Sequence, residues 1–126
     1  MDTWAWVEYF QGSPAGAQAR KVIEGGQVAT SILTLAELAD LHERAGRPGL
    51  EERTQFIASR GPVLDVSPTA ALRAGATKWA QRAKRHPMGL ADAMIYETAR
   101  EHGLELITGD AGFRGLPGVR LIEARR

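Results

Sequence analysis

Short apolar runs alternate with longer amphipathic segments along this chain, and this alternation constrains the fold more than any other feature. Glycine and proline separate the segments at short intervals, which is typical of turns and helix ends. The apolar runs predict four strands, over residues 28–32, 63–66, 104–107 and 119–122. Because these runs are almost wholly apolar, we expect strands that are covered on both faces, as in a parallel sheet between helices.

The longer segments carry helical patterns. They predict six helices, over residues 4–11, 15–24, 33–45, 50–59, 69–85 and 90–102. Strands that alternate with helices predict an α/β fold, a three-layer α/β/α domain with a central, mostly parallel sheet. A length of 126 residues suits one hydrophobic core, so we expect a single domain over residues 1–126. In such sheets, ligands bind beyond the carboxyl ends of the strands.

The composition excludes several classes of protein. The absence of cysteine excludes disulfides, thiolate metal sites and a cysteine nucleophile. No apolar run approaches the roughly 20 residues of a membrane-spanning helix, and the N-terminus lacks the pattern of a signal peptide. We therefore expect a cytoplasmic protein without a membrane partner.

Positive charge is concentrated between Val66 and Ala91, a stretch without any Asp or Glu. Its cations are Arg73, Lys78, Arg82, Lys84 and Arg85. Such a stretch predicts a surface for a polyanion such as RNA, although a solvated helix face is the alternative. Further cations that would extend the surface are Arg114, Arg120, Arg125 and Arg126.

Three of the five aspartates stand where helices are expected to begin or where a strand is expected to end. These are Asp2, Asp92 and Asp110. Capping of a helix N-terminus, which contributes about 0.3–1 kcal/mol, explains each of them singly.

Glu37 is harder to explain by capping, because Leu33 and Leu41 place it on an apolar stripe of its predicted helix. An unpaired buried carboxylate costs several kcal/mol, and no Lys or Arg lies within one helical turn of it. A bound cation is a natural partner, whereas the alternative is that Glu37 reaches water at the edge of the stripe.

Four segments together resemble a known family. They are Asp2-Thr3, Thr34-Leu35-Ala36-Glu37-Leu38, Leu90-Ala91-Asp92-Ala93, and Ile107-Thr108-Gly109-Asp110 followed by Phe113. They resemble the acidic motifs of the PIN-domain ribonucleases, most of all the VapC toxins of type II toxin–antitoxin systems. The motifs occur in the family's order and extend over nearly the whole chain.

This resemblance implies that Asp2, Glu37, Asp92 and Asp110 hold Mg²⁺ or Mn²⁺ and that the protein is an endoribonuclease. It also implies a cognate antitoxin and a homodimer, and Thr108 would orient a ligand or a water molecule. Physical chemistry agrees, since clustered carboxylates raise one another's pKa unless a cation joins them. Hard oxygen ligands select hard divalent ions, which activate water and polarise a phosphodiester.

Two features depart from the family pattern. Only Met1 precedes Asp2, so we expect the first, central strand to be shortened or missing. Trp4 stands where the family often has a small polar residue. These departures leave an alternative, a catalytically silent PIN-like module that binds RNA or protein. A haloacid-dehalogenase-type phosphatase is a poorer match, because Trp4 replaces its second aspartate.

Aromatic residues of the first predicted helix recur at the spacing of a buried face. They are Trp6, Tyr9 and Phe10. We expect them to belong to the hydrophobic core.

Overall fold

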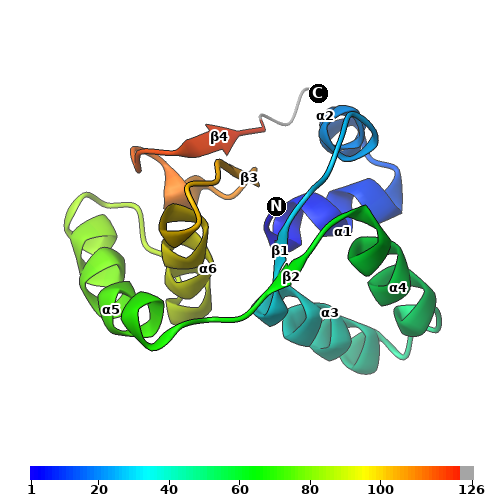
Figure 1. Ribbon diagram of the computed structural model, residues 1–126, viewed down its shortest axis with the longest axis horizontal. Helices are drawn as coiled ribbons and strands as arrows, with labels where there is room; N and C mark the ends of the chain where they lie inside the picture. The colour runs from blue at the N-terminus through cyan, green and yellow to red at the C-terminus, as the bar shows by residue number, and fades with distance from the viewer. Residues whose placement is uncertain (123–126) are drawn as a thin grey trace.

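The computed structural model describes residues 1–122 as six α-helices, one 3-10 helix and four short strands (Figure 1). In chain order the elements are α1 (Thr3–Gln11), α2 (Pro14–Glu24), β1 (Thr30–Ser31), α3 (Ile32–Ala45), α4 (Leu50–Arg60), β2 (Val63–Leu64), α5 (Pro68–Ala83), α6 (Leu90–Glu101), β3 (Leu106–Thr108), η1 (Ala111–Phe113) and β4 (Val119–Leu121). Within this part of the chain, no helix is long and apolar enough to span a membrane.

The alternation of strands and helices is confirmed, and the corrections concern the ends of elements. The expected strand over residues 28–32 is reduced to β1, because the hydroxyl of Ser31 accepts a hydrogen bond from the amide of Leu33 (3.1 Å) and so starts α3 one residue early. The strand expected over 104–107 lies at Leu106–Thr108. Helix α5 ends at Ala83, so Lys84 and Arg85 follow it.

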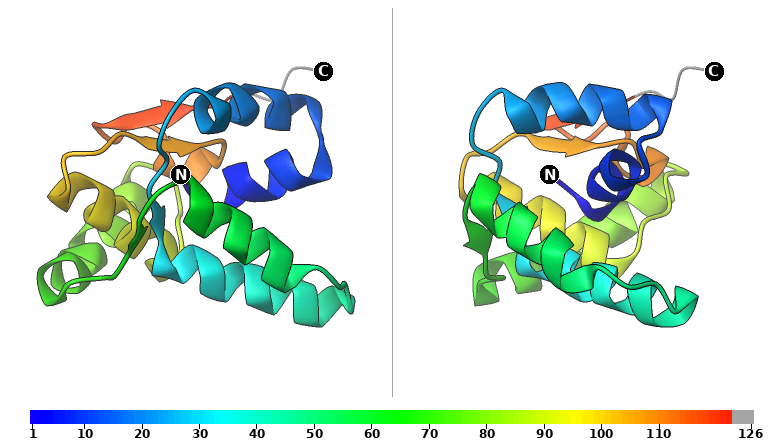
Figure 2. Two further views of the ribbon diagram at one scale, coloured as in Figure 1. Left: turned by 45° about the vertical axis from the view of Figure 1, so that its right-hand side comes forward. Right: turned by 90° about the vertical axis from the view of Figure 1, so that its right-hand side faces the viewer.

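The strands are parallel, as expected, but they form two separate pairs. Strand β1 pairs with β2, and β3 pairs with β4. Figure 2 shows α2 on one side of the strands and α3, α5 and α6 on the other. The α/β layering is therefore confirmed, while the central sheet is divided.

Met1 and Asp2 lie between the two pairs of strands, where a central strand would run. The amino group of Met1 donates to the carbonyl of Ala29 (2.9 Å), and the amide of Asp2 donates to the carbonyl of Ile107 (3.1 Å). Met1 thus bonds the residue directly before β1, and Asp2 bonds β3. Among the described residues no strand precedes α1, as expected from the sequence.

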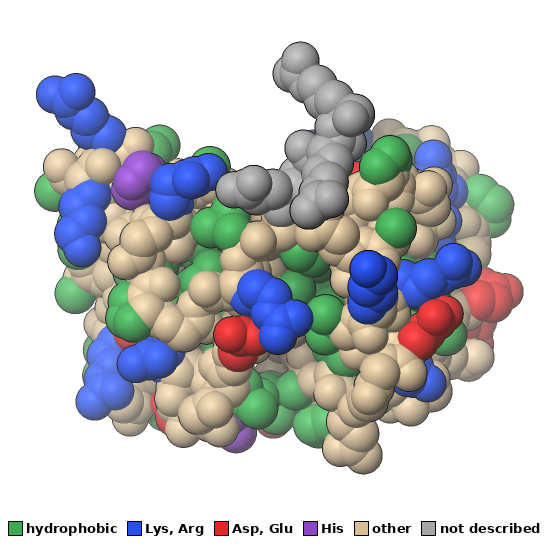
Figure 3. All heavy atoms as spheres, turned by 90° about the horizontal axis from the view of Figure 1, so that it is seen from above, with side chains coloured by type: hydrophobic (Ala, Val, Ile, Leu, Met, Phe, Trp, Pro, Cys, Tyr) green, Lys and Arg blue, Asp and Glu red, His purple; other side chains and the backbone are tan. Residues whose placement is uncertain are grey.

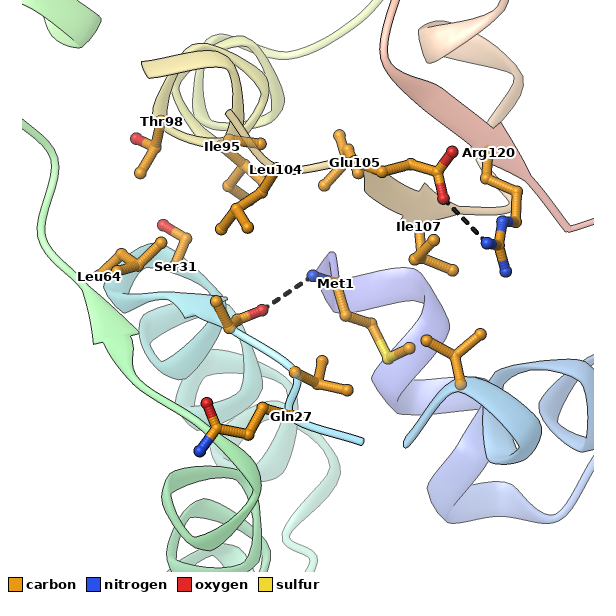
Figure 4. Close-up of a pocket in the computed structure, with 15 residues that line it drawn as sticks. Met1, Gln27, Ser31, Leu64, Ile95, Thr98, Leu104, Glu105, Ile107 and Arg120 are labelled. Atoms are coloured by element: carbon orange, nitrogen blue, oxygen red, sulfur yellow. Dashed lines mark hydrogen bonds and ion pairs between the residues drawn. The ribbon is translucent and has the colours of Figure 1, made fainter. Parts of the chain in front are cut away.

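A cavity of about 200 Å³ extends from Met1 between β1 and β3 (Figure 4). Val28, Ile95 and Leu104 contribute to its apolar lining. Burial lowers the pKa of the Met1 ammonium from 8.0 to about 6, although the charge of Asp2 opposes this shift. The amino group therefore lies where a neutral peptide amide would be more stable.

The hydrophobic core has two parts. One part joins α1, α2, α3 and α4 and contains Trp6, which is fully buried and stacks on Phe10 with ring centroids 5.6 Å apart. Tyr9 and Phe10 pack against it, as expected for the first helix, and Phe56 of α4 completes this aromatic cluster. The other part joins α5, α6, β3 and η1 around Phe113.

Candidate functional site

Asp2 is a buried carboxylate at the N-terminus of α1. Its Oδ1 caps the helix by accepting from the amide of Ala5 (3.0 Å), and its Oδ2 accepts from the hydroxyl of Thr108 (2.5 Å). Burial raises the pKa of Asp2 from 3.8 to about 7, and the negative charge of Asp92 adds to the rise. Helix capping alone does not require such deep burial, because a cap residue can remain exposed to water.

Asp92 lies in the first turn of α6 and faces the other acidic residues. Burial, together with the charges of Glu37 and Asp110, raises its pKa from 3.8 to about 6. Together with the effect of Asp92 on Asp2, these interactions bring all four acidic residues of the motifs into one neighbourhood. Four distant segments of sequence therefore converge at one mouth, which we call the acidic mouth.

Glu37 projects from α3 toward α1. Its Oε1 accepts from the hydroxyl of Thr3 (2.6 Å), and that hydroxyl lies 3.1 Å from the hydroxyl of Thr34. Glu37 is half-buried, so it lies neither in the apolar interior nor free in water. The hydroxyl of Thr3, which is itself held by that of Thr34, thus fixes the orientation of Glu37, and neither threonine was predicted as a site residue. In the sequence, only the position of Thr3 beside Asp2 in the first motif indicated that it belongs to the site.

Thr108 connects two of the acidic residues. Besides donating to Asp2, its hydroxyl oxygen accepts from the amide of Asp110 (3.0 Å), and the Oδ1 of Asp110 caps η1 by accepting from the amide of Gly112 (2.8 Å). Thr108 is fully buried. It therefore links Asp2 to Asp110 from within the buried interior.

The acidic mouth offers oxygen ligands of the kind that hard divalent ions prefer. Among residues 1–122, no group of three or more His, Asp or Glu side chains is arranged so that together they could hold a metal ion. Mg²⁺ commonly keeps several waters and binds through only one or two carboxylates. The mutual repulsion that raises the pKa of Asp92 is relieved by a cation. The residues therefore fit a partly hydrated Mg²⁺ or Mn²⁺.

Trp4 packs against the turn that carries Asp110. A Cβ placed on Gly109 would lie 2.2 Å from the ring of Trp4, so a larger residue at position 109 would displace the ring. The close approach explains glycine between Thr108 and Asp110. Trp4 forms one wall of the site in place of a polar residue.

Gln81 on α5 holds the same turn from the other side. Its Nε2 donates to the carbonyls of Gly112 (2.8 Å) and Arg114 (2.9 Å), just after Asp110. The side chain is fully buried. Helix α5 is thereby fastened beside the acidic mouth, a link that no sequence pattern indicated.

The cations proposed to bind RNA lie on α5 or directly after it. Arg73, Arg82, Lys84 and Arg85 are exposed and Lys78 is half-buried. Figure 3 shows basic side chains gathered at the end of the molecule where α5 lies. Arg114 and Arg120 are exposed, and Arg120 pairs with Glu105 (3.0 Å). Arg125 and Arg126 lie outside the described residues.

Comparison with known proteins identifies relatives of this chain. A family model described as PIN domain matches residues 1–119. A structure of a toxin-antitoxin complex from Klebsiella pneumoniae is 28% identical, covers 98% of this chain and 97% of its own, and has a TM-score of 0.76. VapBC2 from Rickettsia felis, solved with a DNA fragment from its promoter, is 19% identical, covers 98% and 96%, and has a TM-score of 0.66, so it shows the fold alone. No curated protein matches the chain.

Proposed function

Since the chain belongs to the PIN domain family, we propose that it is a metal-dependent endoribonuclease, the VapC-like toxin of a toxin–antitoxin pair. One observation carries this proposal: the charges of Glu37 and Asp110 raise the pKa of Asp92, and the charge of Asp92 raises the pKa of buried Asp2. A purely structural cluster of acids would be neutralised by Arg or Lys. Within residues 1–122, none of these four carboxylates forms an ion pair with a basic side chain.

The proposed mechanism assigns the carboxylates to metal binding. Asp2, Glu37, Asp92 and Asp110 would hold Mg²⁺ or Mn²⁺, which when bound supplies an activated water and polarises the phosphoryl oxygens. Thr3 and Thr108 orient Glu37 and Asp2 through their hydroxyls. Hydrolysis would leave a 5′-phosphate and a 3′-hydroxyl.

The RNA would be held by the basic helix beside the mouth. Arg73, Lys78, Arg82, Lys84 and Arg85 would contact phosphates, which fixes the position of the backbone without reading its sequence. Because α5 packs on α6 and Gln81 binds the Asp110 turn, the cations and carboxylates belong to one rigid unit. Phosphates held on α5 would therefore keep a fixed register relative to Asp92.

The partners proposed for the chain follow from its relatives. A toxin-antitoxin complex is among its structural neighbours, which supports a cognate antitoxin. We also propose that the toxin forms a homodimer and acts in the cytoplasm as a single PIN-like domain.

The test is RNA cleavage by the purified protein. We expect Mg²⁺ or Mn²⁺ to support cleavage, EDTA to abolish it, and Asp92→Asn to reduce it at least about 100-fold. Asp65→Asn is the matched control, because Asp65 is an exposed carboxylate away from the four motifs. Persistent cleavage in Asp92→Asn would refute the assignment.

A second candidate is a catalytically silent PIN-like module. The short first strand and Trp4 in the wall of the mouth favour it. Such a module would bind RNA without cleaving it and would not bind Mn²⁺. Calorimetric titration with Mn²⁺ alone separates the two candidates.

A further inference from the structure

Trp79 lies on the outer face of α5 with its ring in contact with solvent. It is 59% exposed, although tryptophan is highly buried on average. Thr77 and Gln81 stand two residues to either side of it and point to the opposite face, because each residue advances a helix by about 100°. There Thr77 donates to Glu97 of α6 (3.4 Å), and Gln81 holds the turn at η1. The contacts that fasten α5 to its domain are therefore made by the face opposite the indole.

Small residues leave the space beside the indole open. Helical side chains lean toward the N-terminus of their helix, so the ring of Trp79 leans toward Gly75 and Ala76. A Cβ placed on Gly75 would have no neighbour within 4 Å apart from its own stretch of helix, and Ala76 is exposed. A flat group can therefore lie against the ring without displacing a side chain.

Two cations flank the same ring. The guanidinium carbon of Arg82 lies 5.0 Å from the ring centroid of Trp79, and the Nζ of Lys78 lies 5.9 Å from it. These are cation–π distances. No acidic residue occurs between residues 66 and 91, and the ion pairs found within residues 1–122 include neither cation. The surface thus combines an accessible flat ring with positive charge that no carboxylate neutralises.

The charge around the ring favours a nucleic acid over a protein as the occupant. The centre of a protein interface is usually depleted of charged residues, lysine among them, and a second copy of α5 would bring like charges together. A single strand of RNA instead carries a flat base and a phosphate at every nucleotide. Such strands are bound by aromatic side chains that stack on bases and by basic side chains that follow the backbone. In a duplex the base faces are covered by the neighbouring pairs, so only an unpaired base can reach the ring.

We propose that Trp79 stacks on an unpaired base of the RNA substrate while Lys78 and Arg82 hold the adjoining phosphates. This inference rests on the RNA substrate of the proposed function, and it adds that the segment bound on α5 is single-stranded. Stacking tolerates any base, so Trp79 would select unpaired RNA without reading its sequence. Because Gln81 fastens α5 to the turn that follows Asp110, the stacked base is held at a fixed place relative to the acidic mouth.

The test measures RNA binding without cleavage, by fluorescence anisotropy in EDTA. The probes are a labelled oligouridylate of about 12 nucleotides and a blunt RNA duplex of the same length. Trp79→Ala should weaken binding of the single strand about 5- to 150-fold, the usual effect of losing one stacked base. Binding of the duplex should change less than about twofold, because it depends on phosphate contacts. Trp79→Phe keeps an aromatic face and should bind the single strand within about threefold of wild type.

Two control variants separate stacking from other contributions. Leu72→Ala removes an 84% exposed apolar side chain from the same helix, about 10 Å from Trp79 along its axis. It removes no aromatic face and should change the affinity for the single strand less than about twofold. Arg73→Gln removes an exposed cation and should lower the slope of log affinity against log salt by about 0.7–1. Trp79→Ala should leave that slope unchanged.

Three results would overturn the inference. The first is a Trp79→Ala protein that binds the single strand like wild type, which would leave the exposed ring to a protein partner. The second is an equal loss of affinity in Leu72→Ala, which would indicate general apolar contact. The third is an equal loss of affinity for the single strand and the duplex.

The outcome is separable from the proposed function, because binding is measured without cleavage. A wild-type protein that cleaves RNA, together with a Trp79→Ala variant that binds and cleaves equally well, refutes the stacking and leaves the nuclease in place. Binding of the single strand that depends on Trp79, in a protein without nuclease activity, supports the stacking and refutes the nuclease.

Discussion

The buried side of α1 and its N-terminal end differ in the side chains and charged groups that they bury. Its side packs Trp6 and Phe10 with Phe56 of α4 in an apolar cluster, and the indole Nε1 of Trp6 is satisfied by the hydroxyl of Thr30 (3.0 Å). Its N-terminal end, in contrast, buries the Met1 ammonium and the Asp2 carboxylate. The first region stabilises the fold, while the second contains charged groups that would be more stable in water.

This difference indicates what each region is for. A core that only stabilises the fold does not need ionisable groups with displaced pKa values. The acidic mouth keeps such groups together although they repel one another. The cost in stability is understandable if binding of a cation offsets it.

The largest effect on the free energy of unfolding should come from a substitution in the aromatic cluster. Trp6→Ala removes a fully buried ring and should lower the free energy of unfolding by about 3–5 kcal/mol, as large-to-small core substitutions do. Denaturant unfolding measures the change, and Trp6→Phe should lose less. A loss below about 1 kcal/mol would contradict the assignment of this cluster as the main support of the N-terminal half.

A substitution in the acidic mouth should weaken metal binding and leave the stability of the fold nearly unchanged. Thr3→Val removes the hydroxyl that donates to Glu37 and keeps the shape of the side chain. We expect Mn²⁺ affinity and RNA cleavage to fall about 10–100-fold, as is usual when a partner of a metal ligand is lost. The free energy of unfolding should change by less than about 1 kcal/mol. Calorimetric titration and an RNA cleavage assay provide the two measurements, and equal losses in stability and metal affinity would contradict this role.

An extension of the chain into the cavity beside Met1 would remove the buried ammonium at the N-terminal end of α1. Joining an extended apolar segment of about four residues to Met1 replaces the buried ammonium by an amide and fills the space between β1 and β3. We expect the free energy of unfolding to rise by about 1–2 kcal/mol. A Gly-Ser segment of equal length is the control, since it removes the charge but adds little apolar surface. No difference between the two segments would show that the cavity does not accept a strand.

The pH dependence of stability should be unusual in sign. The raised pKa values of Asp2 and Asp92, about 7 and about 6, mean that the metal-free folded protein binds more protons than the unfolded chain above about pH 4. Its stability should therefore fall as the pH rises from about 4 to about 7. The lowered pKa of the Met1 ammonium, about 6 against 8.0, contributes the opposite slope between about pH 6 and 8.

Chemical unfolding over this pH range measures the curve, and Asp92→Asn is the informative variant. We expect this variant to flatten the fall in stability between about pH 4 and 6. It should also stabilise the metal-free protein at neutral pH. The gain should be only about 1 kcal/mol, because water screens the half-buried group. A wild-type protein that gains stability steadily from about pH 4 to 7 would contradict the burial of these carboxylates.

Much of the fold could be predicted because local signals decide it. Ser13 and Ser67 cap α2 and α5 directly before Pro14 and Pro68, and the starts predicted for these helices, residues 15 and 69, are each one residue late. The division of the sheet into two pairs depends on how Met1 and Asp2 bond to both. That is a long-range arrangement, and only the shortness of the first strand was visible in the sequence.

The candidate site was predicted in part for similar reasons. Asp2, Asp92 and Asp110 stand at element ends, where parallel topology gathers them, whereas Glu37 lies within α3. Thr34 and Gln81 lie within helices, and their roles depend on which neighbour the helix meets. The stripe of Leu72 and Trp79 has the periodicity of a core face, yet Ala70 and Ala74 form the buried one. Periodicity identifies an apolar face but not what covers it.

The central claim, that the acidic mouth binds a divalent cation, is tested most directly by thermal unfolding of wild type and Asp92→Asn with and without Mn²⁺. Without metal, Asp92→Asn should be at least as stable as wild type at neutral pH. With Mn²⁺ at about 100 times its dissociation constant, wild type should gain about 2.7 kcal/mol and the variant far less. Equal responses of the two proteins to Mn²⁺, or none in wild type, would contradict the claim.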